Sequence, residues 1–85
     1  MARLAMQMRF YAGVAVEGSW LGVTIDRQVG SLTGLRRTNQ PLGPVAVFGA
    51  SNFPFAFGIL GNDTASALAA GCPVVAKAHP AHPAL

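Results

Sequence analysis

The sequence predicts an α/β fold, in which a helix precedes one βαβ unit of a strand, a second helix and a second strand. Short apolar, β-prone runs at residues 45–48 and 73–76 predict the two strands. The segment between them is long enough for a crossover helix, and such helices join parallel strands. Together these features are typical of part of a doubly wound, Rossmann-like sheet.

The first helix is predicted over residues 2–17, where apolar residues recur at helical spacing: Leu4, Met8, Tyr11 and Ala15. Gly18 follows, and we expect the helix to stop there. Residues 20–26 are expected to add a short turn of helix, residues 30–34 a loop and residues 35–39 a short strand.

The crossover helix is predicted to run from Pro54, which suits a first helical turn, to Ala70, with Gly71 as its cap. Much of its buried face would come from a set of apolar residues: Phe57, Leu60, Ala65, Leu68 and Ala69. Gly58 and Gly61 each cost such a helix about 1 kcal/mol and suggest close approach by another backbone or a ligand. As an alternative, residues 62–64 could restart the helix with a new cap.

Two polar residues follow the predicted strands. Asn52 comes shortly after the first strand, and Lys77 ends the second. Because parallel strands place ligands at their carboxyl ends, we expect both side chains to face one crevice. A helix N-terminus near Pro54 would offer free N–H groups to an anion there.

The composition indicates a segment that belongs inside something larger. Hydrophobic residues make up 52% of the 85 residues and charged residues 11%, against roughly 25% charged residues in ordinary soluble domains. We expect a complete sheet to have helices on both faces of the predicted strands, with the second face covered by helices outside these 85 residues. The single cysteine, Cys72, excludes an internal disulfide, so a cytoplasmic setting is the default.

Three other classes of function are disfavoured. The six basic residues are scattered despite a net charge of +3, which argues against nucleic-acid binding. Glycines, prolines and polar residues interrupt residues 44–63 too often for a membrane span. His79 and His82 have a spacing used by metal sites on helices, but prolines forbid a helix there and no third ligand is in view.

Four short motifs follow one another along the chain: Gly43-Pro44-Val45, Asn52-Phe53-Pro54, Ala67-Leu68-Ala69-Ala70-Gly71 and Val74-Val75-Ala76-Lys77. In this order and at nearly this spacing they resemble the cofactor-domain motifs of the aldehyde dehydrogenase superfamily. The segments GASNFPFAF and DTASALAAGCPVVAKAHPAHP resemble those of the branch that oxidises α-ketoglutaric semialdehyde (2,5-dioxopentanoate). The resemblance covers nearly the whole chain and is weaker before residue 35.

The resemblance implies roles for five residues. Asn52 matches the asparagine whose amide steadies the oxyanion when a thiolate attacks an aldehyde, and Lys77 matches the lysine that binds the adenosine ribose of NAD or NADP. The backbone of Ala50 and Ser51 would line the same cofactor pocket. Pro80 stands where NAD-preferring members often carry a glutamate, so NADP becomes acceptable. An aldehyde substrate, a dinucleotide and a homo-oligomeric parent enzyme are implied as well.

The chain also departs from the family pattern. The family's nucleophilic cysteine and general-base glutamate lie beyond the Lys77 motif, and Cys72 takes the place of a common asparagine, where we expect it to pack as a small buried residue. We therefore expect a fragment that is inactive alone, with residues 1–40 leading into the cofactor domain and residues 41–85 forming its βαβ part.

Alternatives remain for the whole chain and for single residues. The chain could instead be a stand-alone, non-catalytic nucleotide-binding or interaction module. Asn52 could be an ordinary turn asparagine and Lys77 a solvated lysine at a strand end, while Asp63 is most simply a helix cap.

Overall fold

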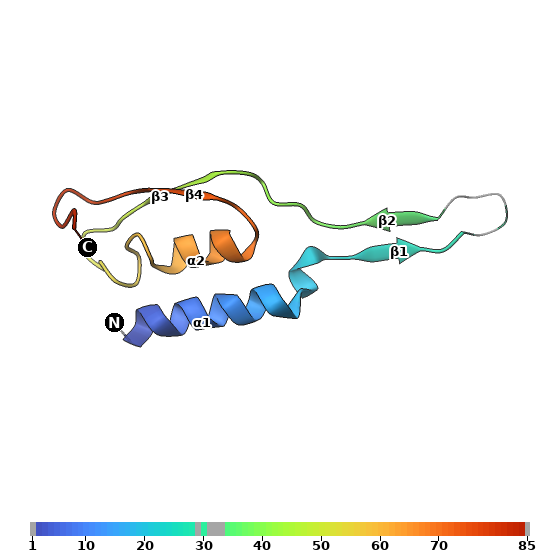
Figure 1. Cartoon of the computed structure of the whole chain (residues 1–85), viewed down its shortest axis with the longest axis horizontal. Helices are drawn as coiled ribbons and strands as arrows, with labels where there is room; N and C mark the ends of the chain where they lie inside the picture. The colour runs from blue at the N-terminus through green and yellow to red at the C-terminus, as the bar shows by residue number, and fades with distance from the viewer. Residues whose placement is uncertain (1, 29, 31–33, 85) are drawn as a thin grey trace.

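The computed structural model describes residues 2–28, 30 and 34–84. Its elements are, in order, α1 (Ala2–Glu17), the 3₁₀ helix η1 (Ser19–Leu21), β1 (Thr24–Asp26), β2 (Leu35–Arg37), β3 (Val45–Phe48), α2 (Asn62–Ala69) and β4 (Val74–Lys77). Figure 1 shows α2 between α1 and the strands β3 and β4, while β1 and β2 extend away from them. The predicted α/β class and the first helix are confirmed.

The two predicted strands pair in parallel. Val45 lies opposite Val74 and Phe48 opposite Lys77. Backbone hydrogen bonds continue the ladder at both ends, from Val45 N to Pro73 O at 2.8 Å and from Gly49 N to Lys77 O at 2.9 Å. The strand–helix–strand order and the parallel pairing are therefore as predicted, while a larger doubly wound sheet stays a prediction.

The crossover helix is shorter than predicted, because residues 53–61 form turns and the helix starts only at Asn62. A Cβ atom at Gly58 would overlap the carbonyl oxygen of Pro54, and one at Gly61 would overlap that of Ala56. The predicted start at Pro54 is thus wrong, and the alternative restart at residues 62–64 is the one observed. The close backbone approach expected at the two glycines is confirmed.

The start of α2 differs in one more detail. Gly61 is the N-cap and provides no side chain, so the expectation that Asp63 caps the helix is wrong. Asp63 instead lies in the first turn, where its negative charge suits the helix dipole. Thr64, which is buried, donates a hydrogen bond from its hydroxyl to Ile59 O and ties the helix to the preceding turn.

The end of α2 is as predicted. Gly71 has φ +82°, a conformation that favours glycine, and its N–H donates to Leu68 O at 3.0 Å. Cys72 N donates to Ala67 O at 2.9 Å, which completes a Schellman motif. The Cys72 side chain is 5% exposed, so the expected packing role is confirmed.

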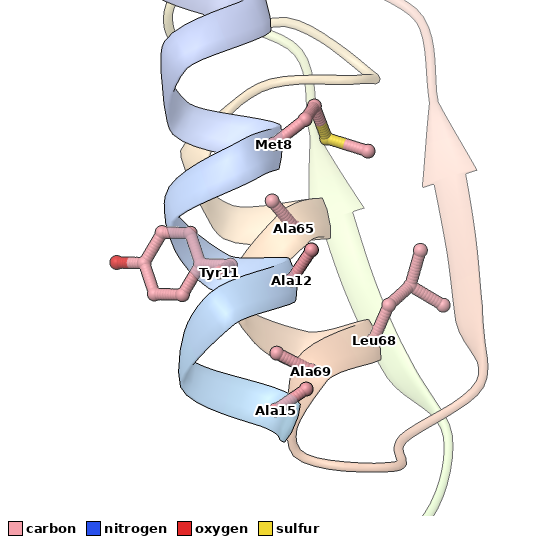
Figure 2. A pocket seen from close by; sticks show the side chains of 7 residues that line it. All are labelled: Met8, Tyr11, Ala12, Ala15, Ala65, Leu68 and Ala69. Carbon is pink, nitrogen blue, oxygen red and sulfur yellow. The ribbon is translucent and has the colours of Figure 1, made fainter. Parts of the chain in front are cut away.

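The two helices pack through small side chains. Figure 2 shows Ala12 and Ala15 of α1 opposite Ala65 and Ala69 of α2. These residues line a groove of about 230 Å³ together with Met8, Tyr11 and Leu68. Three of the four apolar residues predicted at helical spacing on the first helix, Met8, Tyr11 and Ala15, therefore line the groove beside the crossover helix. Gly18, at φ +84°, follows the last residue of α1, as expected.

The segment after α1 is partly mispredicted. Residues 20–26 do not form a helical turn throughout, because Gly22 adopts φ +57° and ends η1 after Leu21. The chain then enters β1, which pairs antiparallel with β2, Thr24 lying opposite Arg37. The strand predicted at residues 35–39 is confirmed over Leu35–Arg37. The predicted loop at residues 30–34 falls largely outside the described residues.

Burial is thin. Val47 and Ala65 are buried, but Phe48 and Leu68 are 69% and 52% exposed. Of the face predicted for the crossover helix, Phe57 and Leu60 are also exposed, because the turns rather than α2 carry them. α2 covers one face of β3, while Ala46 and Phe48 on the other face are exposed, so the uncovered second face expected for these 85 residues is confirmed.

The shape of the chain fits this thin core. Its accessible surface is 6291 Å², whereas a compact monomer of this mass exposes about 4,800 Å². Its radius of gyration is 17.7 Å, against about 12 Å for a compact domain of this length. Within the described part of the chain, neither helix combines the length and apolarity that crossing a bilayer requires.

We expect the 85-residue chain produced alone to self-associate and to unfold without a cooperative transition. The reason is that exposed apolar side chains on β3, on α2 and in the turn between them have no cover. Light scattering after size-exclusion chromatography, with a thermal scan by circular dichroism, tests this at micromolar concentration. A monomer with a sharp thermal transition would contradict the prediction and favour the stand-alone module.

Candidate functional site

The candidate site is built on the edge of the sheet where β3 and β4 end. A Cβ atom added at Gly49 would lie 3.3 Å from His79 N and 3.5 Å from Lys77 O. The backbones that leave the two strands therefore run in direct contact. The expectation that both loops open at one edge is confirmed, and glycine at position 49 permits this approach.

The residues expected to hold a dinucleotide lie at this edge and are largely accessible. Lys77 is exposed, and its ammonium group makes one long hydrogen bond, to Ala78 O at 3.4 Å. Ser51 and Pro80 are exposed, and Ala50 is half-buried. Ala50 N donates to Phe57 O at 3.0 Å, which fixes the backbone just after β3. The Lys77 side chain thus remains available to a ligand.

Asn52 follows Ser51 directly in the chain and is exposed. It lines a cavity of about 200 Å³ with the turn residues 53–56 and with Arg3 from the first turn of α1. Lys77 does not line this cavity. The expectation that Asn52 and Lys77 share one crevice is therefore wrong in this structure.

The physical reason is the turn that replaces the predicted start of the helix. Pro54, Gly58 and Ile59 of this turn face Ala78 and His79 from the loop after β4, together with His82, across a space of only about 10 Å³. The turn thus fills the sheet edge between Asn52 and Lys77. For the same reason the expected helix N-terminus at Pro54 is absent, and Phe57 N is already bonded to Phe53 O at 2.9 Å.

The two histidines lie side by side after β4, with ring centroids 5.6 Å apart. His79 Nδ1 accepts a hydrogen bond from Ala81 N at 3.0 Å, and His79 O accepts one from His82 N at 3.1 Å. These bonds account for the tight turn through Pro80. Within residues 2–28, 30 and 34–84, no cluster joins three side chains of the kinds that ligate metals.

Sequence reasoning missed the part that α1 plays near Asn52. In the sequence, Arg3 is one of six scattered basic residues and nothing marks it as part of a site, yet it lines the Asn52 cavity. One turn later Gln7 is 8% exposed, and its Oε1 atom finds no hydrogen-bond partner among the described residues. The signal that was available is their spacing: two polar side chains four residues apart in an otherwise largely apolar helix lie on one face.

Comparisons with known proteins place this arrangement in context. The model of the aldehyde dehydrogenase family matches residues 1–85. The chain is 52% identical over 85 residues to alpha-ketoglutaric semialdehyde dehydrogenase 2 of Azospirillum brasilense. The matched region covers 94% of this chain and 16% of that protein. It is 47% identical over 85 residues to alpha-ketoglutaric semialdehyde dehydrogenase of Acinetobacter baylyi, with the same coverage of 94% and 16%. The chain thus spans about a sixth of the length of these relatives.

The turn can be tested in a hybrid enzyme, in which residues 1–85 replace the matching segment of the A. brasilense relative. We expect Gly61→Ala to destabilise the hybrid by roughly 1–3 kcal/mol, because the new methyl group would meet the backbone of Ala56. Gly13→Ala is the matched control, since a Cβ there has no neighbour within 4 Å. Thermal unfolding of both variants checks the prediction, and equal midpoints would contradict the turn geometry.

Proposed function

Because this chain belongs to the aldehyde dehydrogenase family, we propose that it forms the oxyanion turn and part of the dinucleotide-binding edge of an NAD(P)-dependent aldehyde dehydrogenase. The proposed substrate is α-ketoglutaric semialdehyde, the compound in the names of both relatives. The observation that supports the proposal best is the parallel pairing of β3 and β4. It brings the loops that carry Asn52 and Lys77 out at the same edge, where parallel sheets bind ligands.

Asn52 is proposed to act on the aldehyde oxygen. When a thiolate attacks the aldehyde carbon, the carbonyl oxygen gains negative charge, and the Asn52 amide N–H would donate a hydrogen bond to it. Phe53 and Phe55 line the same cavity and would lie beside this bond. A donor aimed at developing charge in such a site is typically worth about 10²- to 10³-fold in rate.

The edge near Lys77 is proposed to hold the dinucleotide, which accepts the hydride from the substrate when it is bound. The available side chains fit such a group, because the Lys77 ammonium offers three donors and is exposed. The accessible backbone at Ala50 and Ser51 would lie along the ribose. Pro80 supplies no carboxylate to repel a 2′-phosphate, so we propose that NADP is accepted as well as NAD.

The thiolate and the general base are proposed to come from another part of a full-length enzyme. Cys72 is the single cysteine of this sequence, and its side chain is buried behind the end of α2. A nucleophile must reach the aldehyde carbon, and a buried thiol outside the Asn52 cavity does not. The 85 residues alone are thus proposed to bind and orient rather than to oxidise.

Replacing Asn52 tests the oxyanion role. In the hybrid enzyme we expect Asn52→Ala to lower the rate of acylation by about 10²-fold and to leave NADP affinity nearly unchanged, because the amide acts on charge present only in the transition state. Asn62→Ala, which removes an amide at the start of α2, is the control. Stopped-flow kinetics and cofactor titration measure the two quantities. A loss confined to cofactor binding would show that the assigned roles are reversed.

Pro80 can be tested by introducing the missing carboxylate. We expect Pro80→Glu to raise the KM for NADP relative to that for NAD by about tenfold, because the new carboxylate would repel the 2′-phosphate. Pro83→Glu adds the same charge at another exposed position of the same loop and serves as the control. Steady-state kinetics with each cofactor give the ratio. An unchanged ratio would mean that residue 80 does not face the ribose.

A further inference from the structure

The cavity beside Asn52 contains one charged side chain. Arg3 reaches it from the first turn of α1, and the other lining residues are Asn52, Phe53, Pro54, Phe55 and Ala56. Arg3, which is exposed, therefore lines the same cavity as the proposed oxyanion amide, together with mainly apolar residues. Nothing in the roles assigned so far uses this charge.

We propose that Arg3 binds the carboxylate of the aldehyde substrate and thereby sets the specificity of the site for an aldehyde that carries an acid group. The inference rests on the proposed function, since it takes Asn52 as the residue at the aldehyde end. Arg3 recognises the opposite end of the same molecule. It is thus a specificity-determining residue and takes no part in the bond-breaking steps.

The size of the cavity suits such a molecule. In 2,5-dioxopentanoate four carbon–carbon bonds separate the aldehyde carbon from the carboxylate carbon, a span of about 5 Å when extended. The cavity volume of about 200 Å³ lies below the range of about 300–1,000 Å³ that holds drug-sized ligands. A cavity of this size, lined by one cationic and one amide side chain, suits a short acid aldehyde.

The residues that line the cavity favour selection of an acid aldehyde over a neutral one as well as its binding. A guanidinium presents a planar fork of donors that matches both oxygens of a carboxylate. Arg3 is exposed, so the pair would stay partly hydrated, and the rings of Phe53 and Phe55 beside it would raise its attraction above that in bulk water. A neutral aldehyde of the same length would leave the charge of Arg3 unpaired, and the site would discriminate against it.

Two substitutions on α1 test the assignment in the hybrid enzyme. Arg3→Met removes the charge and keeps much of the length of the side chain, and Arg3→Lys keeps the charge without the fork. Arg9→Met is the matched control, because Arg9 lies on the same helix outside the cavity. For each variant, kcat/KM is measured with α-ketoglutaric semialdehyde and with pentanal, which has five carbons and no acid group.

We expect Arg3→Met to lower the ratio of the two kcat/KM values by about 10- to 100-fold, through KM for the acid substrate, because a hydrogen-bonded charge pair is lost. Arg3→Lys should restore part of the ratio, and Arg9→Met should leave it unchanged. An equal fall with both aldehydes, or an unchanged ratio, would overturn the assignment.

A binding measurement separates this inference from the proposed function. Calorimetric titration with 2-oxoglutarate, the acid formed from this aldehyde, needs no turnover, and we expect Arg3→Met to weaken it by about tenfold or more. Equal affinity of the hybrid enzyme and its Arg3→Met variant for 2-oxoglutarate would overturn the role of Arg3, whatever the activity.

A second hybrid, in which the same segment is placed in the A. baylyi relative, extends the test. Folded hybrids that bind 2-oxoglutarate through Arg3 but oxidise no aldehyde would contradict the proposed function alone, and failure of both hybrids to fold would contradict both.

Discussion

The parallel pairing of β3 with β4 is the constraint on which the rest of the structure depends. Once Val45 lies opposite Val74, Phe48 must lie opposite Lys77, and both strands end at one edge. Parallel strands cannot be joined by a tight turn, so the chain must cross back along one face, where α2 lies. That geometry brings the two loops with candidate binding residues together and leaves the other face of β3 exposed.

The turn between β3 and α2 determines how this edge is divided. Gly58 and Gly61 let the backbone fold back on Pro54 and Ala56, which a helix through these residues would not do. The folded turn packs against the loop after β4, and Asn52 is left on its other side, at a cavity that it shares with Arg3 of α1. The edge thus offers two distinct environments. One lies near Lys77, where we propose that a dinucleotide binds, and the other lies near Asn52 and Arg3, where we propose that a small acid aldehyde binds.

β3, β4, α1 and the end of α2 could be predicted because their signals are local. β-prone runs, apolar spacing and Gly71 each determine the backbone near their own residues. β1 was mistaken for a helical turn because three residues carry little pattern, and its strand conformation depends on pairing with a distant segment. The start of α2 was placed too early because the apolar spacing through Phe57 and Leu60 continues across two glycines that the backbone needs as turns.

The residues of the candidate site stay a prediction from motif resemblance, and their geometry could be predicted only in part. Motif resemblance selects Asn52 and Lys77 one by one, but the packing of residues 54–59 against His79 and His82 decides whether they share a crevice. Arg3 could not be found in this way, because its proximity to Asn52 depends on how α1 packs against α2. Contacts between segments far apart in the sequence leave no periodic signal in either segment.

A crystal structure of the hybrid enzyme with bound NADP tests the central claim most directly. The account predicts that β3 and β4 keep their parallel register, with Val45 opposite Val74, and that the Lys77 ammonium lies within hydrogen-bonding distance of a ribose hydroxyl. It also predicts that the Asn52 amide faces the substrate cavity beside Arg3. A shifted register, or a dinucleotide whose ribose lies away from Lys77, would contradict it.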